Sequence, residues 1–439
     1  ADASSLIDAL HTHGSEARWL ELAAQVRTYP FARFMLAVCF ASPLLYKLSH
    51  RNIYAHIWFE SRCGKTAVTK LGLGIWGDPE KLMGTYNATL FGLEQRCATL
   101  KHLPVALDEL QSLREKYMSV NDVVYNLGNG VGKTRGKIGS GIRRMDGWLN
   151  CILSTGEQPM SADNSMDGVN SRLLELNACP LMNEDSSVNE ELGIRLHTEA
   201  RLNYGFAGER FIHFLVHDVL GGNTAEDGTN PALDADYQMI LDRLGSAAAT
   251  EARSNPHFSS VAVISLADFY SSISVFGLSR EQAADEAVTM GLTVMERIEL
   301  DRPVSSIDAA WNYAVNWIAS NVAHFVNHAA PLSTMYPPRE VSPIYGVVEK
   351  NKVYVNANIL NDALKDAGYS YRKSIKGFQR QGWIDSFTDA DGKRRSQISK
   401  TIKGLSTRVY ALNVNIESLE QESDDLPPFC EPANTDAAL

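Results

Sequence analysis

Three kinds of signal are missing from the sequence, and each absence excludes a class of protein. The six cysteines include no Cys-x-x-Cys pair, which argues against a zinc ribbon and against a disulfide framework. No apolar stretch approaches the roughly 18 residues that a membrane-spanning helix needs, and the chain does not open with a basic-then-apolar secretion signal. We therefore expect a cytoplasmic, soluble protein with reduced thiols and no membrane partner.

Acidic residues outnumber basic ones, but the imbalance is local. The net charge is -11, and residues 417–439 carry seven acidic and no basic side chains. Between Arg339 and Tyr410, fourteen Lys and Arg stand against seven Asp and Glu. The overall sign therefore conceals a basic module, which suits a nucleic-acid partner, followed at 416–439 by an acidic tail that we expect to be disordered.

The spacing of apolar residues changes along the chain and divides it into segments. Residues 1–50 have helical spacing, and residues 51–195 alternate buried strands with helices, which predicts an α/β layer built on a parallel sheet. A helical domain over 196–330 and a proline-rich linker over 331–343 follow. At 344–415, two short helices, a hairpin turning at Asp-Gly and a closing strand predict a C-terminal winged helix.

The triplet Gly-Lys-Thr, which ends a phosphate-binding loop, occurs in WFESRCGKT and again in NGVGKTRG. Such a loop must leave a buried strand and enter a helix, so that backbone N–H groups face the phosphates. Lys65 and Thr66 have this setting, because the apolar run NIYAHIWF precedes them and an amphipathic segment follows. Around Lys133 and Thr134, six glycines between 128 and 141 disfavour a helix. The first copy is therefore the predicted nucleotide site.

Neither copy matches the complete pattern G-x-x-x-x-G-K-[ST]. Phe59 and Leu127 occupy the two positions of its first glycine. That glycine supplies a turn which a bulky residue adopts only with strain, so we expect strain at Phe59. Nucleotide binding should persist, and the rate of ATP turnover stays open.

Three further elements follow the first triplet in the order that an ATPase requires. The apolar run ending at Asp108 and Glu109 predicts a strand end where Asp108 holds the hydration shell of magnesium and Glu109 polarises the attacking water. A later strand ends in Ser154 and Thr155, where a hydroxyl can contact the γ-phosphate or the water. Arg172 comes next. The ordered set predicts an ATP and Mg²⁺ site.

Several of these stretches together resemble domain-of-unknown-function family 927, over roughly residues 15–215. They are IWFESRCGKTAVTKLGLGIWGDPEKLMGTYNAT, LPVALDEL, YNLGNGVGKTRG and WLNCILSTGE. The family includes replicative helicases of mobile elements and is similar to minichromosome-maintenance and superfamily 3 helicases. The resemblance implies a P-loop AAA+ three-layer core over 51–195, and it assigns residues to the nucleotide: Ser61, Arg62, Cys63, Gly64, Lys65, Thr66, Asp108.

The resemblance also implies roles for the remaining site residues. Thr66 and Asp108 would hold magnesium, Glu109 would activate water, and Ser154 or Thr155 would be the sensor of the fourth core strand. Arg172 would act on the site of a neighbouring subunit, which implies a ring, most simply a hexamer.

The second triplet then falls where these helicases carry a hairpin that projects into the ring and grips single-stranded DNA. This pore hairpin, at 129–147, would bind phosphates through five basic residues: Lys133, Arg135, Lys137, Arg143, Arg144. In the winged helix, contacts with duplex DNA are expected from a second set: Arg372, Lys373, Lys376, Lys393, Arg394, Arg395.

We therefore predict an ATP-dependent DNA helicase acting in the replication of a plasmid, phage or genomic island. A second interpretation is a DNA-binding initiator or regulator that uses ATP as an assembly switch. A third is a structural winged-helix adaptor. DNA-stimulated ATPase and unwinding activity would separate the three.

Overall fold

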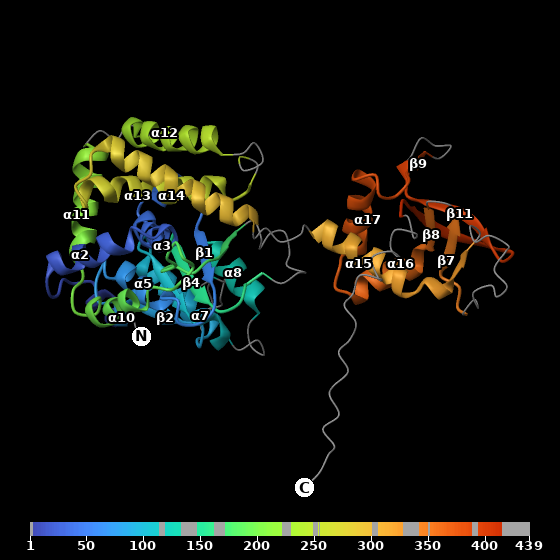
Figure 1. Ribbon diagram of the computed structural model, residues 1–439, viewed down its shortest axis with the longest axis horizontal. Helices are drawn as coiled ribbons and strands as arrows, with labels where there is room; N and C mark the ends of the chain where they lie inside the picture. The colour runs from blue at the N-terminus through green and yellow to red at the C-terminus, as the bar shows by residue number, and fades with distance from the viewer. Residues whose placement is uncertain are drawn as a thin grey trace, which may run out of the picture. The chain divides into compact units, whose positions relative to one another are not determined.

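The computed structural model describes residues 3–113, 119–132, 147–161, 172–221, 230–248, 253, 255–300, 306–327, 342–349, 352–388 and 394–414. The chain forms two compact units, Ala1–Arg302 and Pro303–Leu439 (Figure 1). The pore-hairpin residues Lys133, Arg135, Lys137, Arg143 and Arg144 lie outside the described residues, as do Lys393 and the acidic tail.

Among its described residues, the first unit contains five strands and the helices given below. The strands are β1 (Ile53–Trp58), β2 (Met83–Thr85), β3 (Val105–Asp108), β4 (Cys151–Gly156) and β5 (Leu173–Asn177). The helices before β4 are α1 (Ala3–Asp8), α2 (Glu16–Val26), α3 (Pro30–Ala41), α4 (Leu44–Lys47), α5 (Lys65–Leu73), α6 (Pro79–Leu82), α7 (Leu90–Leu100), η1 (Leu110–Ser112) and α8 (Val120–Gly128). Those after β5 are α10 (Glu190–Glu199), α11 (Phe206–Phe214), the π-helical turn η2 (Leu215–Val219), α12 (Pro231–Ala247), α13 (Phe258–Ser274) and α14 (Arg280–Leu300).

All five strands run parallel, in the order β2-β3-β4-β1-β5. Successive side chains of a strand point to opposite faces, so one strand serves two cores. On β1, Ile53, Ala55 and Ile57 join the core formed with α3 and α13, whereas Tyr54 joins the core formed with α7 and α8. Helices therefore cover both faces of the sheet, and the predicted three-layer α/β core is confirmed.

The helices after β5 are not a separate domain. Buried side chains of α10 through α14 share one core with α2, α3 and one face of the sheet, and α13 packs against both α3 and α14 (Figure 1). Almost every residue of α13 is buried, because neighbours cover it on all sides. The structure therefore merges the expected segments 1–50, 51–195 and most of 196–330 into one unit.

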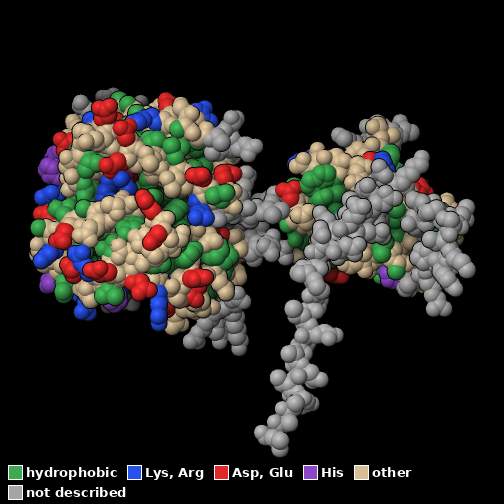
Figure 2. All heavy atoms as spheres, in the orientation of Figure 1, with side chains coloured by type: hydrophobic (Ala, Val, Ile, Leu, Met, Phe, Trp, Pro, Cys, Tyr) green, Lys and Arg blue, Asp and Glu red, His purple; other side chains and the backbone are tan. Residues whose placement is uncertain are grey.

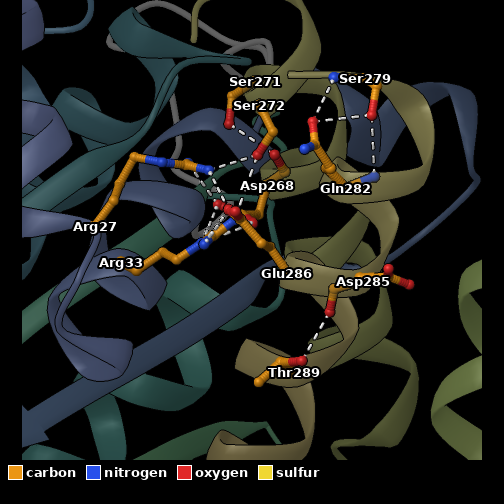
Figure 3. A network of polar contacts seen from close by, with 10 residues as sticks. All are labelled: Arg27, Arg33, Asp268, Ser271, Ser272, Ser279, Gln282, Asp285, Glu286 and Thr289. Atoms are coloured by element: carbon orange, nitrogen blue, oxygen red, sulfur yellow. Dashed lines mark hydrogen bonds and ion pairs between the residues drawn. The ribbon is translucent and has the colours of Figure 1, made fainter. Parts of the chain in front are cut away.

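A buried ion cluster joins the N-terminal helices to the later ones (Figure 3). Arg27, at the end of α2, and Arg33, on α3, both donate to the carboxylate of Asp268 on α13, at 2.8 and 2.6 Å. Arg33 also donates to Glu286 on α14 at 2.6 Å. The Asp268 side chain is 1% exposed, so its charge depends on the two arginines for compensation.

The described residues of the second unit form a mixed sheet with three helices packed against it. The helices are α15 (Ser306–Ser320), α16 (Ala357–Asp366) and α17 (Tyr371–Arg380), with a short turn η4 (Val322–His324). The strands are β6 (Phe325–Asn327), β7 (Gly346–Glu349), β8 (Lys352–Asn356), β9 (Phe387–Thr388), β10 (Arg394–Arg395), β11 (Gln397–Ile402) and β12 (Leu405–Leu412). The main sheet has the order β11-β12-β8-β7-β6, and β9 pairs with β10.

The predicted winged-helix plan is confirmed, and its N-terminal boundary moves. The two short helices are α16 and α17, the closing strand is β12, and β9 and β10 form the antiparallel arms of the expected hairpin. Helix α15, expected in the preceding helical domain, instead buries Ala310, Ala314 and Ile318 in the core of this unit. Its amphipathic pattern predicts a helix but not the partner against which the apolar face packs.

Acidic and basic side chains are interspersed on the face of the first unit that Figure 2 shows. Among the described residues, no helix is both long and apolar enough to cross a membrane.

Candidate nucleotide-binding site

The first Gly-Lys-Thr triplet connects β1 to α5, as the sequence predicts. Gly64 precedes the helix with a φ of 87°, a left-handed conformation that favours glycine. A Cβ at this position would lie 2.5 Å from the Leu181 side chain, so a larger residue would also collide. No side chain caps the first turn of α5. Its N–H groups therefore remain available to an anion, as in a phosphate-binding loop.

The backbone strain expected at Phe59 lies elsewhere in the loop. The residues with positive φ are Arg62, at 65°, and Gly64. Phe59 is not among the residues with positive φ, and its N–H donates to the carbonyl oxygen of Gly156 at 3.3 Å. Phe59 thus continues the direction of β1, and the loop makes its turn later. The prediction of backbone strain at Phe59 is therefore wrong, and the strained residue of the loop is Arg62.

The Lys65 side chain is folded back onto its own loop. Its ammonium group donates to the carbonyl oxygens of Phe59 and Glu60, both at 2.8 Å, and to the sulfur of Cys63 at 3.3 Å. Lys65 is only 9% exposed. These contacts compensate the buried charge, and a bound phosphate would have to replace them.

The acidic pair lies at the carboxyl end of β3. Asp108 ends the strand, and Glu109 adopts a φ of 59° as the chain turns into η1. The N–H of Glu109 donates to the Asp108 carboxylate at 3.1 Å, and the hydroxyl of Thr155 donates to the same oxygen. Asp108 is half-buried and Glu109 is exposed. The pair therefore offers one oriented carboxylate and one that is free to turn toward a water molecule.

Of the two candidate hydroxyls on β4, only Thr155 reaches the Asp108 side chain. Ser154 and Thr155 are adjacent in a strand and therefore point to opposite faces. Ser154 is fully buried and forms hydrogen bonds with His56 at 2.8 Å and with Tyr86 at 2.5 Å. Thr155 therefore supplies the hydroxyl that is expected at the site from the end of this strand. Ser154 instead has a structural role in the buried interior.

The contacts of His56 define its tautomer. Its Nε2 lies 3.0 Å from the carbonyl oxygen of Gln158, which can only accept, so Nε2 carries the proton. Its Nδ1 then accepts from the hydroxyl of Ser154, which in turn accepts from Tyr86. Burial lowers the pKa of His56 to about 4. The neutral imidazole of His56 therefore stabilises the end of β4 that carries Thr155.

These elements enclose a cavity of about 530 Å³ at the carboxyl ends of β1, β3 and β4. Among the predicted site residues of the first unit that the structure describes, Ser154 and Arg172 do not line the cavity. The predicted residues that line it are Ser61, Arg62, Cys63, Gly64, Lys65, Thr66, Asp108, Glu109 and Thr155.

One wall of the cavity comes from α10, which the sequence analysis did not single out. Glu190, Gly193, Ile194 and His197 repeat at i, i+3, i+4 and i+7 and therefore share one face of the helix. Ile194 is 66% exposed on this face. The opposite face, which includes Leu192 and Leu196, packs into the core. The periodicity is visible in the sequence, but its position opposite the phosphate loop is not.

Arg172 lies at the other edge of the sheet. It immediately precedes β5, which runs parallel to β1, so it is near the amino ends of the strands whereas the cavity is at their carboxyl ends. Its guanidinium lies over the ring of Tyr125 on α8, 5.2 Å from the centroid. An arginine that serves a neighbour's site need not reach its own cavity, so the predicted role in trans stays a prediction.

The second Gly-Lys-Thr triplet has a different setting from the first. Helix α8 ends at Gly128, so a helix and not a buried strand leads into it. Val131 and Gly147 form an antiparallel bridge, and the N–H of Trp148 donates to the carbonyl oxygen of Gly130 at 2.9 Å. The two ends of the segment 129–147 are thus paired as at the base of a hairpin. Its basic residues lie outside the described part, so their DNA contacts stay a prediction.

Helix α17 in the second unit presents a basic face. Ser374, Ile375 and Phe378 are buried, whereas the exposed side of the helix carries four basic residues: Arg372, Lys373, Lys376 and Arg380. Arg395, on the arm β10 of the hairpin, is also exposed, and Arg394 lies beside it in the same strand. An amphipathic helix with a basic outer face fits the major groove of duplex DNA.

Comparisons with known proteins agree with this fold. A family model described as "Domain of unknown function (DUF927)" matches residues 2–146, and one described as "Cch helix turn helix domain" matches residues 305–417. The second match begins just before α15, in accordance with the boundary in the structure. No curated protein matches the chain.

A solved structure described as "SCCmec type IV Cch - active helicase" is similar in fold. The TM-score is 0.63 at 18% sequence identity, with 94% of this chain and 72% of that chain covered. At this identity the likeness concerns the fold. The sequence-based recognition is confirmed by the two matches, to the DUF927 model over residues 2–146 and to the Cch helix-turn-helix model over residues 305–417.

Proposed function

We propose that this protein is an ATP-dependent DNA helicase of a mobile genetic element. The observation that carries the proposal is the convergence, in one cavity, of the loop before α5 with Asp108, Glu109 and Thr155. The fold likeness to a chain described as an active helicase supports the same conclusion.

The residues of the cavity suit ATP with magnesium. The uncapped first turn of α5 and the Lys65 ammonium favour the phosphates, and the carboxylate of Asp108 with the hydroxyl of Thr66 offers the oxygen ligands that magnesium prefers. Magnesium neutralises charge on the phosphates during transfer. Glu109 orients the attacking water, and Thr155 holds the Asp108 side chain in place. Arg172 of a neighbouring subunit completes the site, which requires a ring, most simply a hexamer.

DNA would be bound at two places. The pore hairpin at 129–147 would bind single-stranded DNA through Lys133 and the other basic residues of the hairpin, and it would move with the nucleotide state. The basic face of α17 binds duplex DNA, as at an origin.

Helix α10 supplies the surface for the nucleoside. The phosphates lie at the amino end of α5, so the base extends toward the opposite wall, where the exposed aliphatic side chain of Ile194 offers an apolar platform. His197 and Thr198, on the same wall, can donate or accept hydrogen bonds at the edge of the base.

The test is ATP hydrolysis with and without single-stranded DNA, together with unwinding of a forked duplex. We expect DNA to stimulate hydrolysis, and Glu109→Gln to bind ATP while losing about 100-fold or more of the rate. Absence of turnover in the presence of DNA would exclude the helicase.

A second candidate is a DNA-binding initiator that uses ATP as an assembly switch. The observation in its favour is the engagement of Lys65 by its own loop, which ATP would have to reverse. ATP-dependent assembly on duplex DNA without unwinding would establish this function, and the same Glu109→Gln variant would then assemble normally.

A further inference from the structure

Two cysteines meet beside the nucleotide loop. Cys63 lies within the loop, and Cys179 follows β5 by two residues. The Cys179 thiol donates to the backbone oxygen of Cys63, with its Sγ 3.7 Å from that oxygen. The two residues are 1% and 3% exposed. Strand β5 neighbours β1 in the sheet, so the adjacency follows from the core topology.

The two sulfurs have different chemical characters. The neighbouring Cys179 side chain and the ammonium of Lys65, which lies 3.3 Å from the Cys63 sulfur, lower the pKa of Cys63 to about 6. The same contact raises the pKa of Cys179. A thiolate is the nucleophilic form of cysteine, so Cys63 is the attacking sulfur and Cys179 the one that resolves.

The other described cysteines lack this environment. Cys39, Cys97 and Cys151 are buried in the core, and burial raises the pKa of each. Among the described cysteines, Cys63 alone lines the cavity and so can meet a small oxidant that enters it.

We propose that Cys63 and Cys179 form a peroxide-sensitive dithiol that closes to a disulfide and inactivates the nucleotide site. The Cys63 thiolate attacks one oxygen of hydrogen peroxide, the O–O bond breaks, and the hydroxide that leaves takes up a proton to become water. The Cys179 sulfur then attacks the resulting sulfenic acid, an S–S bond replaces the S–O bond, and the second oxygen leaves as water. The two thiols lose two electrons and two protons in total, and the peroxide is reduced to two waters.

The disulfide would act on the loop mechanically. It ties the residue before Gly64 to the segment that leads to Leu181, which already packs against Gly64. It also removes the thiolate that Lys65 contacts. The loop can then no longer move so that the Lys65 ammonium exchanges its contacts with the loop for contacts with a phosphate.

The experiment uses the full chain with Cys430→Ser, treated with hydrogen peroxide and analysed by peptide mass spectrometry. We expect a Cys63–Cys179 disulfide and a loss of ATP affinity of about tenfold or more. Dithiothreitol should reduce the disulfide and restore the ATP affinity. ATP bound beforehand should slow the reaction, because it fills the cavity.

Cys179→Ala is the matched variant. It should bind ATP as the parent does under reducing conditions, and under peroxide it should gain a sulfenic acid at Cys63 without the reversible disulfide. Oxidation of Cys39, Cys97 or Cys151 at the rate of Cys63, or the lack of a disulfide in the parent, would overturn the proposal. Because the disulfide is detected by mass, this result does not depend on whether ATP is the ligand.

Discussion

The ammonium group of Lys65 lies 2.8 Å from the carbonyl oxygen of Phe59, the residue that replaces the first glycine of the phosphate-loop pattern. The loop thereby supplies, from its own backbone, acceptors for the charge that a phosphate would otherwise compensate. The two Gly-Lys-Thr triplets also differ in what precedes them, because strand β1 leads into the first and helix α8 leads into the second.

Lys65→Ala should weaken ATP binding about 10- to 100-fold, since charge-assisted hydrogen bonds to phosphate disappear. Lys133→Ala should retain ATP binding and weaken single-stranded DNA binding. Titration with ATP and with labelled DNA measures both. The exposed Lys47→Ala serves as the control for removing one lysine. If Lys133→Ala abolished ATP binding and preserved DNA binding, the assignment of the two triplets would be reversed.

Ile194→Asp should weaken ATP binding about tenfold and leave the binding of inorganic tripolyphosphate nearly unchanged. The substitution removes the apolar platform for the base and adds a negative charge at the wall opposite the phosphate loop. Isothermal titration with both ligands gives the ratio. Leu202→Asp, at an aliphatic side chain that is 52% exposed and does not line the cavity, is the control. Equal losses for both ligands would contradict a base site on α10.

Arg372→Ala and Lys376→Ala should each weaken the binding of duplex DNA and reduce the slope of log K against log salt by about one. Both residues are exposed on the face of α17 away from its core. Fluorescence anisotropy over a salt series measures the slope. Lys352→Ala is the control: Lys352 lies on β8 and pairs with Asp385, so its removal should leave the slope unchanged. An unchanged slope in the α17 variants would exclude this helix from the interface.

Asp268→Asn should lower the free energy of unfolding by about 3 kcal/mol or more, because two buried arginines lose their shared counter-charge. Urea denaturation of the full chain measures the change. Asp285→Asn on α14 is the matched control: its carboxylate is 59% exposed and pairs with Arg243, so its loss should be within about 1 kcal/mol. Similar losses in both variants would show that the cluster does not hold the N-terminal helices to α13.

Acid should destabilise the first unit through His56. Its folded pKa of about 4 lies below the value of about 6.5 for an exposed histidine. Between these values the unfolded chain binds more protons, so the free energy of unfolding falls as the pH drops from about 6.5 to about 4. The expected contribution is about 3 kcal/mol. His56→Asn should be less stable at neutral pH but lose less across this window in urea titrations. Identical pH profiles would contradict the buried neutral state.

The sequence alone determined the local chemistry of the site and the order of the core elements. Apolar runs ending in Asp108 and in Thr155 identify strand ends, because buried parallel strands have a continuous apolar pattern that small polar residues interrupt. The glycines around Lys133 disfavour a helix whatever the tertiary context. Lys65, Thr66, Asp108 and Glu109 could therefore be predicted to converge.

Only the tertiary structure decided which of two adjacent hydroxyls serves the site, since the strand pattern of Ser154 and Thr155 fits either face. It also decided that α10 walls the cavity and that α15 belongs to the second unit, because an amphipathic helix does not specify its partner. The contact between Cys63 and Cys179 depends on β5 lying beside β1, a relation between residues more than a hundred positions apart that no local pattern encodes.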